Sequence, residues 1–112
     1  MKIIFFGTPN FAANNLQSLI EKGHDIVAVV TPPDSKKGRG KKLKPCAVKE
    51  IAIEYNIPVL QPIKLKDESF INELESFNAD LFVVVAFRML PKVVWNIPPK
   101  GTINLHTSLL PN

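Results

Sequence analysis

Apolar residues along the chain occur in short runs, separated by segments in which apolar residues recur every third or fourth position. The runs are rich in β-branched residues, which is typical of strands buried on both faces of a parallel sheet. Gly7 and the pair Pro32–Pro33 end two of them, as expected of residues that break strands. The predicted strands are Lys2–Phe6, Asp25–Thr31, Pro58–Leu60, Asp80–Ala86 and Gly101–His106.

The segments between the runs predict helices. The first helix is expected between Asn10, as its N-cap, and Gly23, as its C-cap. A second helix is predicted after Pro45 and a third after Asp67, whose side chain can cap it. Residues 90–95 predict one helical turn.

Strands that alternate with helices predict an α/β fold, in which a doubly wound parallel sheet carries helices on both faces. The segment between the second strand and the second helix contains Gly38 and Gly40 and is predicted to be a long flexible loop. Six residues remain after the last predicted strand, and no helix follows to cover it. We therefore expect a domain that is incomplete at its C-terminus.

The composition narrows the class of protein. The 112 residues are 46% apolar and 21% charged, which is typical of a globular domain and excludes a disordered or collagen-like chain. No apolar run approaches the ~20 residues of a membrane span, so we expect no membrane partner. The single cysteine, Cys46, and the two histidines give no metal-ligand spacing. These features predict a cytoplasmic protein without a metal.

Positive charge is concentrated in one segment. Residues 34–44 contain six lysines and arginines and one acid, Asp34, so this segment has a net charge of +5 in a chain whose net charge is +4. Such a segment suits a polyanion, for example a nucleic acid. A solvated linker without a partner would have the same composition, and charge alone leaves both interpretations open.

The sequence departs from two known nucleotide-binding patterns. The turn after the first strand contains only Gly7, so the G-x-G-x-x-G dinucleotide pattern is missing. The Gly38–Lys42 stretch resembles a phosphate loop, but Lys41 is not followed by the serine or threonine that such a loop requires.

The last predicted strand carries two polar residues with catalytic potential. Asn104 and His106 are two positions apart, so their side chains share one face near the carboxyl end of the strand. In open α/β sheets this end borders the binding crevice. An amide can stabilise an oxyanion and an imidazole can move a proton, a pair that suits acyl transfer. The alternative is that both side chains only satisfy backbone groups.

Several motifs resemble one enzyme family. Asn104–Pro111 resembles the N-[LIV]-H-x-S-L-L-P signature of formyltransferases that use 10-formyltetrahydrofolate. Phe6–Ala12 resembles the F-x-G-T-P-x-F-A opening of the methionyl-tRNA formyltransferase family, and Pro33–Leu43 resembles its P-D-x-x-x-G-R-G-K-K-L loop. The segments Pro45–Lys49 and Pro58–Pro62 match as well, so the resemblance covers essentially the whole chain. It implies a Rossmann-like formyltransferase fold.

The resemblance also implies roles for residues near the C-terminus. Asn104 would bind the carbonyl oxygen of the transferred formyl group. His106 would assist proton movement, together with an aspartate further along the chain. The residues that match the folate-contacting segment are Ser108, Leu109, Leu110 and Pro111.

Two further segments gain an implied role. Val85–Met89 would line the pteridine pocket, where Arg88 replaces the glycine of the family's commoner A-Y-G-x form. The basic segment would enter the acceptor end of initiator tRNA through Arg39, Lys41 and Lys42. Formyltransferases that act on small acceptors lack this loop, so the loop favours tRNA as the substrate.

The resemblance assigns residues 1–112 to the N-terminal part of a catalytic domain, with the rest of that domain and a C-terminal β-barrel domain expected beyond Asn112. We expect the 112-residue chain alone to be inactive. The expected partners are folate and initiator methionyl-tRNA, and we expect a monomer. Two alternatives remain, namely a formyltransferase of glycinamide ribonucleotide or an amino sugar, and a non-enzymatic RNA-binding module.

Overall fold

A computed structural model describes residues 1–7, 10–32, 35–36, 43–44, 47–85 and 90–105. Within this part of the chain, five strands form one parallel sheet in the order β5-β2-β1-β6-β7. These strands are β1 (Lys2–Gly7), β2 (Asp25–Val30), β5 (Val59–Leu60), β6 (Leu81–Val85) and β7 (Thr102–Leu105). The described helices are α1 (Asn10–Glu21), α2 (Ala47–Glu54), α3 (Glu68–Ser76) and α4 (Lys92–Trp95).

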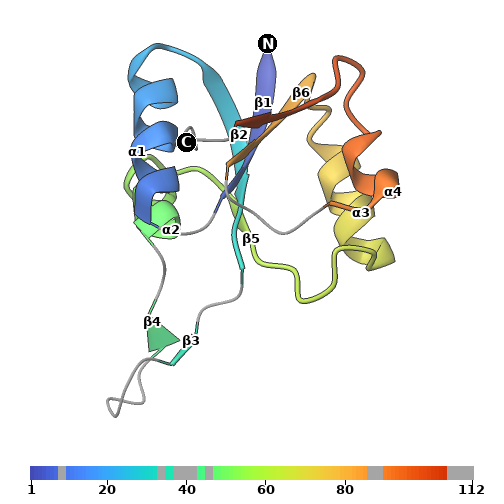
Figure 1. The fold of residues 1–112 in the computed structure, drawn as a ribbon, viewed down its shortest axis with the longest axis horizontal. Coiled ribbons are helices and arrows are strands. Elements are labelled where there is room, and N and C mark those ends of the chain that lie inside the picture. The colour runs from blue at the N-terminus through green and yellow to red at the C-terminus, as the bar shows by residue number, and fades with distance from the viewer. Residues whose placement is uncertain (8–9, 33–34, 37–42, 45–46, 86–89, 106–112) are drawn as a thin grey trace, which may run out of the picture.

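The sheet is doubly wound. From β1 the chain adds β2 and then β5 on one side, and it then returns to add β6 and β7 on the other side. Right-handed crossovers in opposite directions place the helices on opposite faces. Figure 1 shows α1 and α2 on one face of the sheet and α3 and α4 on the other. The order of the strands therefore reverses between β1 and β6, which are paired from Ile3–Leu81 to Gly7–Val85.

Alternate residues of the central strands fill two separate cores. Ile4 and Phe6 of β1 face α3 and α4, where the Phe6 ring lies 5.0 Å from the ring of Phe82. Ile3 and Phe5 belong to the core that α1 and α2 cover. The central strands are thus buried on both faces, which explains why they appear in the sequence as continuous apolar runs.

The predicted helix ends are largely confirmed. The Asp67 carboxylate accepts a hydrogen bond from the Ser69 backbone N–H, as expected of the N-cap of α3. Gly23, with φ of +89°, ends α1, because its N–H donates to Ile20 and the N–H of His24 donates to Leu19. The N-cap assignment of Asn10 is wrong, since this residue already belongs to α1.

The predicted long loop between β2 and α2 contains a short hairpin, which corrects that prediction. Strands β3 (Ser35–Lys36) and β4 (Leu43–Lys44) pair antiparallel, with Ser35 opposite Lys44 and Lys36 opposite Leu43. Backbone hydrogen bonds make this pairing, and the mainly polar sequence carries no apolar alternation to predict it. In Figure 1 this β3–β4 hairpin projects away from the sheet.

Gly7 ends β1 at a point where there is no room for a side chain. A Cβ atom at Gly7 would lie 2.6 Å from Cε1 of Phe5 and 3.1 Å from Cβ of Ala12 in α1. Phe5 and Ala12 are fully buried, so neither can move aside easily. A glycine at this position therefore lets α1 pack closely on the carboxyl end of β1.

We predict that Gly7→Ala lowers the free energy of unfolding by about 1–3 kcal/mol, the usual cost of an overpacked core. Chemical denaturation of the purified protein measures this change. In a Phe5→Leu background the same substitution should cost less, because the ring that the new methyl group meets is gone. An equal cost in both backgrounds would mean that Phe5 is not the source of the strain.

Candidate functional site

The carboxyl ends of three strands lie side by side where the order of the sheet reverses. Gly7 of β1 pairs with Val85 of β6, and Val85 pairs with Leu105 of β7. In open α/β sheets ligands bind in the crevice outside the carboxyl ends of the strands at such a reversal. This edge is therefore the candidate site.

Asn104 is the described site residue at this edge. It pairs with Val84, which faces the core under α3 and α4. Two residues earlier on the same face, the Thr102 hydroxyl donates to the Trp95 carbonyl at 2.8 Å and ties β7 to the end of α4. Ile103 pairs with Val83 of the opposite core. The prediction that Asn104 and Ile103 point to opposite faces is thus confirmed.

The Asn104 side chain is exposed to solvent, and no described residue forms a hydrogen bond with its carboxamide. The N–H groups of a carboxamide can donate to a carbonyl oxygen, and they do so more strongly as that oxygen gains negative charge. Asn104 is therefore placed to polarise an acyl group bound at the carboxyl edge of the sheet.

The other predicted site residues lie outside the described residues. The structure thus brings Asn104 to the carboxyl edge and leaves the predicted juxtaposition of Asn104 with His106 as a prediction. The same applies to Arg88 and most of the predicted pteridine segment, of which Val85 alone is described. The undescribed residues with predicted contacts to substrates are His106, Ser108, Leu109, Leu110, Pro111, Arg39, Lys41 and Lys42.

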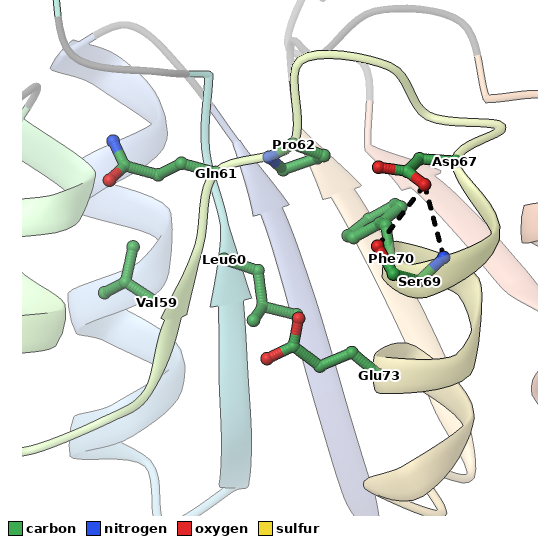
Figure 2. Close-up of a pocket in the computed structure, with 8 residues that line it drawn as sticks. All are labelled: Val59, Leu60, Gln61, Pro62, Asp67, Ser69, Phe70 and Glu73. Carbon is green, nitrogen blue, oxygen red and sulfur yellow. Dashed lines mark hydrogen bonds between the residues drawn. The ribbon is translucent and has the colours of Figure 1, made fainter.

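Two cavities among the described residues lie elsewhere. One cavity, of about 270 Å³, lies between the edge strand β5 and the first turns of α3 (Figure 2). The other, of about 400 Å³, lies between the end of α3 and the segment before β7, with Asp80 and Pro99 in its lining. The described residues contain no group of three His, Cys, Asp or Glu side chains that could hold a metal. None of the helices in the described ranges is long and apolar enough to cross a bilayer.

One polar bridge near the carboxyl edge was not predicted from the sequence. The Gln61 side chain, directly after β5, bonds both the Pro32 carbonyl and the Lys49 ammonium at 3.1 Å. The segments that contain Gln61 and Lys49 matched the family motifs, but nothing in the sequence paired these residues with each other or with Pro32. Their proximity follows from β2 and β5 pairing and from the packing of α2 beside them.

The whole chain, residues 1–112, matches the family described as formyl transferase. The chain belongs to the formyl transferase family. This family membership confirms the predicted resemblance, and the observed strand order agrees with the predicted doubly wound, Rossmann-like fold.

Relatives within the formyl transferase family are identical to this chain at about half of the aligned positions. It is 55% identical to the methionyl-tRNA formyltransferase of Parabacteroides distasonis over 99% of the chain, and 56% identical to that of Flavobacterium johnsoniae over 100%. The enzyme of Clostridioides difficile is 54% identical over 99% of the chain. The aligned region is 35%, 36% and 36% of these proteins, so the chain spans about a third of the relatives' length.

Proposed function

We propose that the full-length protein transfers a formyl group from 10-formyltetrahydrofolate to the amino group of methionyl-tRNA, the aminoacylated initiator tRNA. The observation that carries this proposal is the identity of 54–56% across essentially the whole chain to proteins named methionyl-tRNA formyltransferase. The basic segment between β2 and α2 lies within this aligned region, which favours a tRNA over a small acceptor.

The reaction requires stabilisation of charge on the formyl oxygen. The methionyl amine attacks the formyl carbon and loses a proton, and the oxygen gains negative charge in the tetrahedral intermediate. The bond from the carbon to N10 of the folate then breaks as N10 takes up a proton, which releases tetrahydrofolate. We assign the hydrogen bond to that oxygen to the exposed Asn104 carboxamide. We assign removal of the proton from the attacking amine to His106, whose imidazole can accept a proton near neutral pH.

Different segments of the chain are proposed to contact the folate and the tRNA. We propose that residues 108–111, just beyond β7, contact the folate, and that the chain after Val85 lines the pteridine pocket. Arg39, Lys41 and Lys42 lie between β3 and β4 in the sequence, and their charges suit the phosphates of the tRNA acceptor end. The projection of the β3–β4 hairpin away from the sheet in Figure 1 supports contact with a large partner.

A role in translation initiation would place the protein in the cytoplasm, and we propose that it acts as a monomer.

Residues 1–112 are proposed to be the first part of a catalytic domain. An aspartate that orients His106, the remaining wall of the folate pocket and a β-barrel domain that contacts tRNA would follow in the full-length protein. The 112-residue chain should therefore form no formyl-methionyl-tRNA, whereas the full-length protein should do so under the same conditions. An assay with radiolabelled methionyl-tRNA tests this, and formyl transfer by the short chain would contradict the division of the site between the two parts.

A further inference from the structure

Gln61 connects the two ends of the segment that carries the β3–β4 hairpin. Its Nε2 donates to the Pro32 carbonyl at 3.1 Å, and its Oε1 accepts from Lys49 Nζ at 3.1 Å. Pro32 is the described residue that precedes segment 33–46, and Lys49 lies in the first turn of α2, just after that segment. One side chain thus links the point where the chain leaves the sheet to the helix at which it returns.

The two described partners, Pro32 and Lys49, each lie next to a residue of the protein core. Thr31, next to Pro32, is fully buried, and its N–H donates to the Leu60 carbonyl at 3.0 Å. Val48, next to Lys49, is fully buried in the core under α1 and α2. The two hydrogen bonds of Gln61 are partly buried, which reduces competition from water. The bridge therefore joins two anchored points, one directly before segment 33–46 and one just after it.

The bridge requires a side chain that both donates and accepts a hydrogen bond. A carboxamide provides an N–H for the Pro32 carbonyl and an oxygen for the Lys49 ammonium, whereas a carboxylate provides only the oxygen. Figure 2 shows the Gln61 side chain extending to the opposite side of β5 from Leu60 and Phe70, although Gln61 is also one of the residues that line the cavity beside α3. The described hydrogen bonds to Pro32 and Lys49 account for this orientation.

We propose that Gln61 is a positioning residue that sets the direction in which the β3–β4 hairpin leaves the sheet and thereby presents the basic segment to tRNA. This proposal rests on the proposed function, because it concerns binding of the tRNA substrate. It assigns no contact between Gln61 and either substrate. Its predicted effect is confined to the hairpin and to the KM for methionyl-tRNA.

The test uses the full-length protein with Gln61→Ala, measured at saturating 10-formyltetrahydrofolate. We expect the KM for methionyl-tRNA to rise about fivefold to tenfold, the size of effect of losing one or two hydrogen bonds, while kcat changes less than about twofold. Backbone amides of residues 35–44 should exchange with deuterium several-fold faster. Gln61→Glu keeps the acceptor for Lys49 but loses the donor for Pro32, so its KM and exchange rates should lie between those of the wild type and Gln61→Ala. Lys49→Arg keeps a donor for Gln61 and should resemble the wild type in both measurements.

Gln17→Ala is the matched control. Gln17 also forms a side-chain hydrogen bond at 3.1 Å, but its partner, Glu21, lies on the same helix, α1. This variant should leave the KM and the exchange of residues 35–44 unchanged. Unchanged exchange and an unchanged KM in Gln61→Ala would overturn the proposal, as would an equal fall in kcat. If the wild-type protein does not formylate methionyl-tRNA, the proposed function fails, while the exchange measurement still decides whether Gln61 positions the hairpin.

Discussion

Formyl transfer by the full-length protein is expected to fall by about 10²–10³-fold in kcat when Asn104 is replaced by alanine. The reason is that the carboxamide donates to an oxygen that gains negative charge only as the reaction proceeds, so its loss affects the transition state most. Asn104→Asp should be at least as impaired, because it puts a negative charge where a donor is needed. Steady-state kinetics with methionyl-tRNA as the acceptor measure both variants.

Thr102→Val is the control for this prediction. Thr102 lies on the same strand and faces the same side, but its hydroxyl bonds the Trp95 carbonyl rather than a substrate. This variant should lose about 1 kcal/mol of stability and keep kcat within about twofold. Because the Asn104 side chain is exposed, its replacement should change the free energy of unfolding by less than about 0.5 kcal/mol. Normal catalysis by Asn104→Ala would show that the amide has no role in transfer.

A second large effect is expected from the basic segment. Replacing Arg39, Lys41 and Lys42 together by alanine should raise the KM for methionyl-tRNA more than tenfold at about 0.1 M salt. Each cation that neutralises a phosphate contributes about 0.9 to the slope of log affinity against log salt concentration. The triple variant should therefore have a slope flatter by about 2–3. Measurements of the affinity for methionyl-tRNA at several salt concentrations determine this slope.

Three exposed lysines on other parts of the surface, Lys64, Lys66 and Lys100, provide the matched control. Their joint replacement by alanine removes the same charge from the whole protein. It should change the KM only slightly and leave the salt slope as in the wild type. Equal effects of the two triple variants would mean that overall charge, and not the segment between β3 and β4, attracts the tRNA.

The central strands β1, β2 and β6 could be predicted because residues on both of their faces are buried. Leu81–Val85 contains only apolar residues, and the structure places it next to the central strand β1. Helix ends with a local chemical cause were also predictable, as at Asp67 and Gly23. The alternation of side chains along a strand predicted that Asn104 and Ile103 lie on opposite faces of β7, and the pairing of Asn104 with Val84 identifies which face each takes.

Features that depend on how separate segments of the chain pair or pack could not be predicted. The β3–β4 hairpin forms through backbone pairing of Ser35–Lys36 with Leu43–Lys44, and these side chains carry no strand pattern. The Gln61 bridge requires Pro32 and Lys49, which the pairing of β2 with β5 and the packing of α2 bring to one place. The narrow space at Gly7 likewise depends on how α1 meets the Phe5 ring.

The most direct test of the proposed function is a formyl-transfer assay of the full-length protein with 10-formyltetrahydrofolate and three acceptors in parallel. The acceptors are methionyl-tRNA, glycinamide ribonucleotide and an amino-sugar nucleotide. We predict formylation of methionyl-tRNA alone, with loss of that activity in His106→Ala by about 10²–10⁴-fold. Transfer only to a small acceptor would contradict the proposed substrate, and no transfer to any acceptor would leave a non-enzymatic RNA-binding module as the better account.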